Sequence, residues 1–161
     1  MNYLIREIQE SEYHVLEDFL YEAIYIPEGE ERPNKEIVKT PELQVYLHDF
    51  GKGQGDYGFV ALADNKIIGV VWGRIMKDYG HIDDNTPSLA LAVYSEYRGQ
   101  GIGTALMQKI MNKLQESSYD CVSLSVQKSN PAFHLYKKLG FEIVGKTMGE
   151  TEEEIIMRHL L

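Results

Sequence analysis

The spacing of apolar side chains in the first third of the chain predicts one strand and two helices. Residues 2–8 alternate between apolar and polar positions, which is the pattern of a short strand. A helix is expected between an N-cap at Ser11 and a stop at Pro27, where apolar side chains recur every three or four positions at Leu16, Phe19, Leu20, Ala23 and Ile24. A second, shorter helix is expected after Pro41 and before the glycine cluster at residues 51–55.

The rest of the chain predicts six more strands and two more helices. The strands are expected at residues 57–63, 66–76, 88–93, 121–126, 141–144 and 154–160. The first two form a hairpin whose two-residue turn is Asp64-Asn65. The helices are expected at residues 101–117 and, after an N-cap at Asn130, from Pro131 to Gly140.

These elements predict a single α/β domain over residues 1–161, with a mixed sheet and helices on both faces. A chain of 161 residues with 43% apolar side chains can bury enough core to fold as one unit. No linker, internal repeat or low-complexity segment interrupts the pattern.

Charge and composition narrow the range of partners. The 16 basic and 25 acidic residues give a net charge of −9, which argues against nucleic acid or an anionic membrane because both require a basic surface. No apolar stretch approaches the roughly 20 residues of a membrane span, and residues 1–6 lack a targeting pattern, so we expect a cytoplasmic location. The single cysteine, Cys121, excludes an internal disulfide and a cysteine-based zinc site, and no metal is expected.

The charge is distributed unevenly along the chain. Residues 1–50 contain 12 acidic and 4 basic side chains, a net charge of −8, whereas residues 98–138 carry a net charge of +4. One interpretation is that the basic segment receives an anionic cofactor while the acidic segment faces a cationic ligand. The other is that both segments are solvated helix faces.

Two phosphate-binding patterns occur in the wrong context. Residues 140–147 match G-x-x-x-x-G-K-[ST], but a phosphate loop lies between a strand and a helix, whereas here a helix comes first and the inner residues are a predicted strand. Residues 53–58 match G-x-G-x-x-G, but they precede a strand. We therefore expect neither segment to bind a nucleotide.

A third glycine-rich segment has the context that an anion site requires. The segment reads Arg98-Gly99-Gln100-Gly101-Ile102-Gly103-Thr104 and lies between a predicted strand and a predicted helix. Unpaired N–H groups and the positive end of the helix dipole attract an anion there. The glycines leave the backbone open to a phosphate, and Arg98 adds a positive charge. The alternative is a tight turn that binds no ligand.

A second motif forms a short capped helix with the sequence Asn130-Pro-Ala-Phe-His-Leu-Tyr136-Lys-Lys-Leu-Gly140-Phe141. Tyr136 shares one face of this helix with its apolar positions and is therefore expected to point inward. A buried tyrosine is by itself more often part of the core than catalytic.

Taken together, the two motifs resemble those of the GNAT family of N-acetyltransferases. They are the Arg-Gly-Gln-Gly-Ile-Gly run after a short strand and the later Asn-Pro-Ala-x-x-Leu-Tyr-x-x-Leu-Gly-Phe segment. The resemblance covers nearly the whole chain, because the order of elements matches as well. It implies a GNAT-like domain with a mostly antiparallel sheet of about seven strands, splayed between residues 88–93 and 121–126 to admit acetyl-CoA.

The same resemblance implies roles for individual residues. The pyrophosphate of acetyl-CoA is expected on the backbone amides of Arg98, Gly99, Gln100, Gly101, Ile102, Gly103 and Thr104, and the pantetheine arm along Leu91, Ala92 and Val93. Asn130 matches a residue that contacts the cofactor. Tyr136 matches the family's proton donor to the departing thiolate. A backbone N–H near Val93 is the expected oxyanion donor.

The general base is left open by the sequence. Many relatives carry a carboxylate where this chain has Pro87-Ser88. One of Asp83, Asp84 and His81 is a candidate that acts through water, and loss of the proton to solvent is another route. Alternatively, these three residues belong to a polar turn.

The expected acceptor is a small cationic amine bound over the acidic N-terminal third. Tyr21 and Tyr25 follow one another there at helical spacing, as required for stacking on an ammonium group. Two other functions stay open: acetylation of protein lysines or N-termini, and binding of acyl-CoA without catalysis. The sequence carries no signal on oligomeric state and is compatible with a homodimer.

Overall fold

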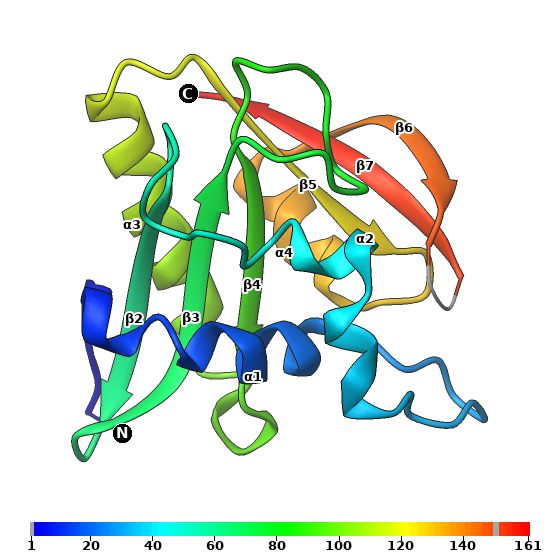
Figure 1. The fold of residues 1–161 in the computed structure, drawn as a ribbon, viewed down its shortest axis with the longest axis horizontal. Coiled ribbons are helices and arrows are strands. Elements are labelled where there is room, and N and C mark those ends of the chain that lie inside the picture. Colours follow the sequence, from blue (N-terminus) through cyan, green and yellow to red (C-terminus); the bar gives the residue numbers. More distant parts are fainter. Residues whose placement is uncertain (1, 150–151) are drawn as a thin grey trace.

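The computed structural model describes residues 2–149 and 152–161 and confirms the predicted sheet. Seven strands form one sheet in the order β1-β2-β3-β4-β5-β7-β6 (Figure 1). Their bounds are β1 (Leu4–Glu7), β2 (Tyr57–Ala63), β3 (Lys66–Arg74), β4 (Ser88–Val93), β5 (Cys121–Gln127), β6 (Glu142–Met148) and β7 (Glu153–Leu160). Neighbouring strands are antiparallel except β4 and β5, which run parallel.

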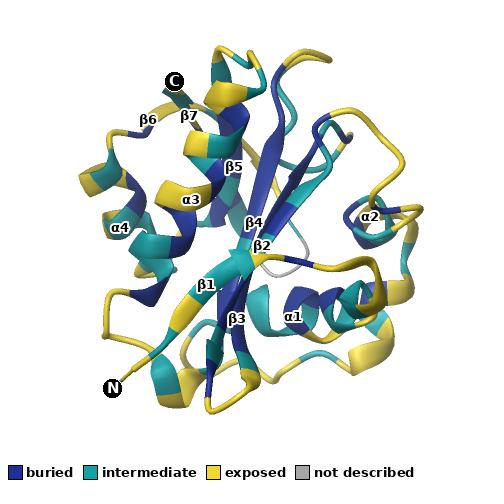
Figure 2. Cartoon of the chain, turned by 90° about the vertical axis from the view of Figure 1, so that its left-hand side faces the viewer, coloured by how far each residue is buried: buried dark blue, intermediate teal, exposed yellow. Residues whose placement is uncertain are grey.

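Helices cover both faces of this sheet (Figure 2). One face carries α1 (Val15–Ala23) and α2 (Pro41–Gln44), and the other carries α3 (Ile102–Glu116) and α4 (Ala132–Leu139). We call them the α1–α2 face and the α3–α4 face. Three short 3₁₀ helices complete the fold: η1 (Glu10–Glu12), η2 (Lys35–Lys39) and η3 (Ser95–Tyr97). Within the described part of the chain, no helix has the length and apolar character needed to cross a membrane.

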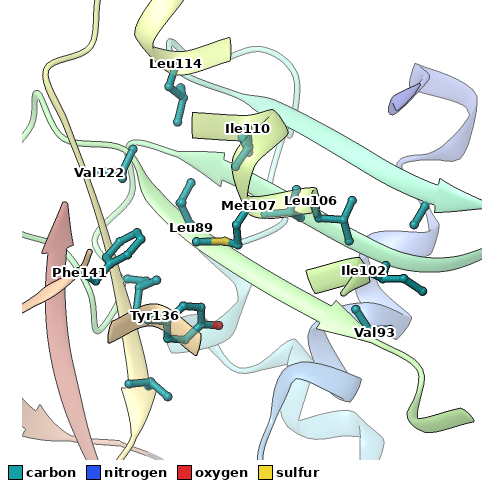
Figure 3. Close-up of a cluster of buried hydrophobic side chains, with 14 of the residues drawn as sticks. Leu89, Val93, Ile102, Leu106, Met107, Ile110, Leu114, Val122, Tyr136 and Phe141 are labelled. Atoms are coloured by element: carbon teal, nitrogen blue, oxygen red, sulfur yellow. The ribbon is translucent and has the colours of Figure 1, made fainter. Parts of the chain in front are cut away.

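Each face of the sheet has its own hydrophobic core, because side chains alternate along a strand. In β4, Leu89 and Val93 pack on the α3–α4 face, whereas Ala90 and Ala92 pack on the α1–α2 face. The first core is built on one stripe of α3 (Figure 3), made of Ile102, Leu106, Ile110 and Leu114. The second core joins α1 to β3 through Leu16, Phe19, Leu20 and Trp72. β4, which is apolar from Leu89 to Val93, thus contributes side chains to both cores.

The predicted hairpin turn is confirmed by its backbone. Asp64 and Asn65 both adopt the left-handed conformation, with φ of 51° and 62°, as a two-residue turn that matches the strand twist requires. The strand after this turn ends at Arg74, two residues earlier than expected. At the other end of the sheet, β6 continues to Met148 and is longer than predicted.

The expected start of the first helix is wrong. Ser11 lies inside η1 and caps nothing, and α1 begins only at Val15. The start of η1 is instead fixed by a capping box between Gln9 and Glu12. The Glu12 carboxylate also pairs with Arg6 of β1 at 2.7 Å, so its side chain links the first strand to the segment that leads into α1.

The second predicted helix is shorter than its apolar pattern suggests. α2 has four residues, and residues 45–50 form turns. Side chains of β3 take carbonyl groups that a continuing helix would use: Trp72 Nε1 donates to the Tyr46 carbonyl at 3.0 Å, and Arg74 Nη1 donates to the His48 carbonyl at 2.7 Å. Contacts with the sheet therefore override the local helical pattern.

A buried ion pair closes the loop at residues 51–55. Arg74 and Asp56 pair at 3.1 Å, with side chains 10% and 2% exposed. Asp56 Oδ2 also accepts the backbone N–H groups of Gly51 at 3.0 Å and Gly53 at 3.1 Å. The G-x-G-x-x-G match is therefore a loop, as expected, and the structure shows in addition that this loop encloses an internal carboxylate. The other rejected match lies on the end of α4 and on β6, which confirms that it is no phosphate loop.

Asp56→Ala is expected to lower the free energy of unfolding by about 3–5 kcal/mol, because it leaves the buried Arg74 charge without its partner. The control is Glu17→Gln, which removes an exposed pair with Lys39 at 3.7 Å and should cost less than about 1 kcal/mol. Urea denaturation measures both. A loss for Asp56→Ala no larger than that of the control would contradict the prediction.

Candidate functional site

The sheet is split between its two parallel strands. β4 and β5 are paired at one register position, where Ser88 lies opposite Ser123, and they diverge beyond it (Figure 1). The expected splay is thus confirmed. The split opens toward the C-terminal ends of both strands, where Val93 leads into the glycine-rich loop and Gln127 leads toward α4.

The glycine-rich loop has the backbone that an anion site needs. Gly99 and Gly101 have φ of 76° and 81°, and a Cβ built on either would meet no atom within 4 Å. Gly101 is the N-cap of α3, and Ala105 N–H donates to the Gly101 carbonyl, so the N–H groups of residues 102–104 have no partner within the helix. Arg98 Nε donates to the carbonyl that ends β4, on Val93, at 2.9 Å.

Gly103 differs from the other two glycines. A Cβ at Gly103 would lie 3.5 Å from Leu135 Cδ2 of α4 and 3.6 Å from Leu91 Cδ2 of β4, which are ordinary van der Waals distances. This residue faces the packed side of α3 and not the open loop. Of the three glycines, only Gly99 and Gly101 therefore expose the backbone as expected.

Tyr136 lies on the α3–α4 face, where α4 packs against β5. The residue is 7% exposed, and its ring meets Phe141 edge-on with centroids 6.0 Å apart. Among the described residues its hydroxyl has no hydrogen-bond partner, and it points away from Phe141 toward the side where Val93 and Ile102 lie (Figure 3). Burial raises the pKa of Tyr136 to about 12, so the hydroxyl is protonated at neutral pH and can donate a proton.

Asn130 lies between the end of β5 and α4. Its Oδ1 accepts the Ala132 N–H at 2.9 Å, and Pro131 already has helical angles. The side chain therefore caps the helix that carries Tyr136. Its expected contact with the cofactor stays a prediction.

The expected base candidates lie in a polar turn before β4, at the paired end of the split. Asp83 Oδ1 accepts from Asn85 N–H and from Thr86 Oγ1, both at 2.8 Å, and these bonds lower the pKa of Asp83. His81 Nδ1 is held by a backbone carbonyl at 2.8 Å, and the Asp84 side chain is 83% exposed. The polar-turn interpretation accounts for all three residues.

Two acids that the sequence analysis missed, the half-buried Asp78 and the buried Glu154, lie on the α1–α2 face of the split. Asp78, in the loop before β4, accepts a hydrogen bond from Ser88 Oγ at 2.5 Å. Glu154, near the start of β7, lies opposite Gln127 of β5 and is 7% exposed. One oxygen of each, Asp78 Oδ1 and Glu154 Oε2, is buried with no hydrogen-bond partner in the described structure.

Hydroxyl groups surround these acids, and together they form one acid cluster, defined as Tyr46, Asp78, Ser88, Ser125 and Glu154. The pKa of Tyr46 is influenced by Asp78 and Ser125, and the pKa of Glu154 by Ser125, so these side chains lie close to one another. Burial raises the pKa of Asp78, and it raises the pKa of Glu154 to about 7 with smaller contributions from the Glu152 and Asp78 charges. No lysine, arginine or histidine of the described segments forms an ion pair with either acid.

The tyrosine expected to bind a ligand cation already contacts a cation of the chain. The Arg32 guanidinium lies 4.2 Å from the centroid of the Tyr21 ring and pairs with Glu22 at 3.1 Å. The Tyr21 hydroxyl donates to the Pro33 carbonyl at 2.6 Å. These side chains line a hollow of about 360 Å³, which is completed by Asp18, Lys35 and Tyr94. Arg32 therefore already contacts the Tyr21 ring, and a role of Tyr21 in binding a ligand stays a prediction.

Tyr25 belongs to the segment that runs from α1 past the C-terminal end of β5. Its backbone carbonyl accepts a hydrogen bond from Gln127 Nε2 at 3.4 Å. This contact brings the segment beside the open end of the split, on the same face as Glu154. A role for the Tyr25 side chain stays a prediction.

Comparisons with known proteins agree with this geometry. The model of the acetyltransferase (GNAT) family matches residues 11–141. An N-alpha-acetyltransferase of Sulfurisphaera tokodaii is 39% identical over 95 residues, which cover 53% of this chain and 56% of that protein. N-acetylaspartate synthetase of Homo sapiens is 34% identical over 96 residues, which cover 58% of this chain and 30% of that protein. These matches span about half or less of the curated relatives.

A solved structure is similar over its whole length. The PaiA N-acetyltransferase of Thermoplasma acidophilum, in complex with coenzyme A, has a TM-score of 0.68 and 21% sequence identity, with 100% of both chains covered. At this identity the likeness shows a common fold.

Proposed function

Because the chain belongs to the GNAT family of acetyltransferases, we propose that it transfers the acetyl group of acetyl-CoA to the primary amine of a small cationic molecule. Acetyl-CoA is the donor substrate of this family. The observation that carries the proposal is the split between β4 and β5. It has a protonated tyrosine on one face and, on the other, two acids that each have one oxygen without a partner among the described residues. A proton donor and an ammonium site thus lie on opposite sides of one opening.

The residues of the α3–α4 face fit the donor. The open backbone at Gly99 and Gly101, the N-terminus of α3 and the exposed Arg98 provide N–H groups and positive charge for a pyrophosphate. Residues 91–93 of β4 lie beyond the paired position and have backbone edges that β5 does not cover. We place the pantetheine arm along this stretch.

The acetyl group arrives as a thioester, which an uncharged amine can attack. The amine must therefore lose the proton of its ammonium form, and the departing sulfur must gain one. Tyr136 is the proposed donor to the sulfur, because its hydroxyl is protonated and makes no other hydrogen bond in the described structure.

The preference for a cationic acceptor is supported on the α1–α2 face. Each of the two acids of the acid cluster has one buried oxygen without a hydrogen-bond partner, and neither acid pairs with a basic side chain of the described residues; an ammonium group supplies the missing donors. The segment that covers this face lies within residues 1–50, which carry a net charge of −8. Internal pairs such as Arg32 with Glu22 are already included in that total, so the negative field persists outside the protein.

A protein N-terminus is the second candidate acceptor. It is favoured by the similarity to the N-alpha-acetyltransferase of Sulfurisphaera tokodaii. An α-amino group would meet the same acids, but the rest of the peptide would have to leave across the segment that contains Tyr25.

We expect polyamine-like amines to be acetylated with a kcat/KM about tenfold higher than neutral amines at low ionic strength. The advantage should shrink when salt is raised, because attraction by surface charge is screened. Release of the CoA thiol is measured for cationic, neutral and carboxylate-bearing amines and for a short peptide, each at two ionic strengths. Equal efficiency for all amines, independent of salt, would exclude charge-based selection.

The same assay distinguishes catalysis from binding alone. A protein that only binds acyl-CoA would release no more thiol with an amine than without one. A peptide with a free N-terminus that outperforms every small amine would instead establish the second candidate.

A further inference from the structure

We propose that Glu154 is the group that removes the proton from the acceptor's ammonium, and that Asp78, Tyr46 and Ser125 position it. This inference rests on the proposed function and adds the base that the sequence leaves open. Glu154 lies near the start of β7 on the α1–α2 face, whereas Tyr136 lies on the opposite face of the split sheet. The two proton-transfer groups therefore approach the opening from its two sides.

The first support is the unused hydrogen-bonding capacity of Glu154. The residue is 7% exposed, and its Oε2 has no partner in the described part of the chain. A buried acceptor without a donor is costly, so its presence in a folded protein requires an explanation. Asp78 Oδ1 is a second such oxygen in the same cluster. An ammonium group carries three donors and can satisfy both oxygens at once.

The second support is the contrast between the two acids. Asp78 accepts a hydrogen bond from Ser88 Oγ and interacts with Tyr46 and with the backbone at Gly80, and each of these donors stabilises its charged form. No such hydrogen bond from the described residues to the Glu154 carboxylate is seen, and the nearby Ser125 lowers the pKa of Glu154 by less than burial raises it. Glu154 is therefore the stronger base, and Asp78 is the fixed negative neighbour that helps to hold the cation.

The third support is the origin of the cluster in five separate places along the chain. Tyr46 follows α2, Asp78 precedes β4, Ser88 begins β4, Ser125 lies on β5, and Glu154 lies on β7. Gly80 allows this close approach, because a Cβ there would lie 2.8 Å from the Leu124 carbonyl carbon. The cluster is thus formed only where the loop before β4 fills the α1–α2 side of the split.

The proposed reaction begins with transfer of a proton from the ammonium group to Glu154. An N–H bond of the ammonium breaks, its electron pair stays on nitrogen, and an O–H bond forms on the Glu154 carboxylate. The amine then forms the N–C bond as the C–S bond breaks, the electron pair of that bond stays on sulfur, and Tyr136 protonates the sulfur. The proton lost by the acetylated nitrogen replaces the one given by Tyr136, and Glu154 returns its proton to solvent.

The pH dependence follows from the groups that face Glu154. They are Asp78 from the loop before β4, Tyr46 from the segment after α2, and Glu152 from its own hairpin. Burial and the nearby acids raise the pKa of Glu154 to about 7, so its basic form accumulates as the pH rises through neutrality. At high pH an increasing share of the amine is already uncharged, and the base is no longer needed.

The decisive variant is Glu154→Gln, with Glu153→Gln as the matched control, because the control removes the same charge from the neighbouring position of β7. We expect Glu154→Gln to lower kcat about 30-fold at pH 6.5, with the deficit closing toward pH 9.5. The affinity for acetyl-CoA should not change. Glu153→Gln should keep the pH profile of the unchanged protein.

Two further measurements separate a chemical role from a structural one. Formate added to Glu154→Ala should restore part of the lost rate, since it supplies a carboxylate to the vacated space. A carbon-detected titration should show a carboxyl with a midpoint near 7 that is missing from Glu154→Gln.

The outcomes distinguish this inference from the proposed function. If the unchanged protein acetylates no amine, the proposed function fails. If it acetylates amines while Glu154→Gln has the same rate and the same pH profile, only the role of Glu154 is overturned. A deficit in Glu154→Gln that is equal at all pH values, without rescue by formate, would also overturn it and leave Glu154 a structural residue.

Discussion

Gly101→Val is expected to weaken the binding of acetyl-CoA by about 10²-fold or more. Gly101 has a φ of 81° and is the N-cap of α3, and a β-branched residue strongly disfavours this left-handed conformation. The backbone would either keep the strain or leave the conformation. If it leaves, the free N–H groups at the start of α3 no longer point into the loop, and the anion site is lost.

Calorimetric titration of the folded variant with acetyl-CoA measures this effect, and two controls separate its causes. Gly29→Val places valine at a similar φ of 85° with open space, but in a remote loop, so it should carry the same strain without loss of affinity. Gly103→Ala should keep the affinity within about fivefold, because a methyl group fits beside Leu135 and Leu91. Unchanged binding by Gly101→Val would show that the phosphates are held elsewhere.

The sequence predicts the fold well because its signals are local and agree with one another. The two helices of the α3–α4 face have clear caps, Gly101 and Gly140, and both are found in the left-handed conformation. The hairpin turn at residues 64–65 and the apolar run of β4 are similarly local. Predictions fail in the N-terminal third, where distant side chains decide: η1 is fixed by Glu12 and Arg6, and α2 is cut short by β3.

The acid cluster could not be predicted, because its members come from segments far apart in the chain. Nothing in the sequence around Asp78 distinguishes it from Asp83 and Asp84, and only the fold shows which of these acids has a buried oxygen atom. One sequence signal was available. β5 alternates polar and apolar residues although it lies inside the sheet, and its polar side consists of Ser123, Ser125 and Gln127. When the side chains on one side of a central strand are polar, that side is expected to line a binding site and not to pack into a second hydrophobic core.

Tyr21 shows why charge totals alone are a weak guide to a binding site. The acidic excess of residues 1–50 is real, but the cation that contacts the Tyr21 ring is Arg32, which lies 11 positions further along the same chain. Local pairing thus occupies the tyrosine that charge patterning selects. The long-range electrostatic field of residues 1–50 already includes the charge of Arg32, so this pairing does not weaken it. The preference for cationic amines and the identity of the residues that contact the cation are therefore separate questions.

Tyr136→Phe is expected to lower turnover by about 10²-fold while leaving the affinity for acetyl-CoA nearly unchanged. The ring contributes to the core beside Phe141, and phenylalanine keeps that packing. The hydroxyl makes no hydrogen bond with the described residues, so its removal leaves no internal donor or acceptor unsatisfied. The variant therefore removes a proton donor and little else, and the expected factor is the lower end for loss of a positioned acid.

Steady-state rates with a saturating amine, together with calorimetric binding, measure this prediction. The direction of the pH dependence can also be predicted. Because burial raises the pKa of Tyr136 to about 12, the tyrosine keeps its proton throughout the pH range in which Glu154 loses its own. The unchanged protein should accordingly gain activity through neutral pH without a matching loss up to about pH 10. Tyr136→Phe should show the same rise at a rate lower by a constant factor, since the base is intact. Equal turnover in the two proteins would make Tyr136 a core residue, and the proton for the departing sulfur would then have to come from solvent or from the amine itself.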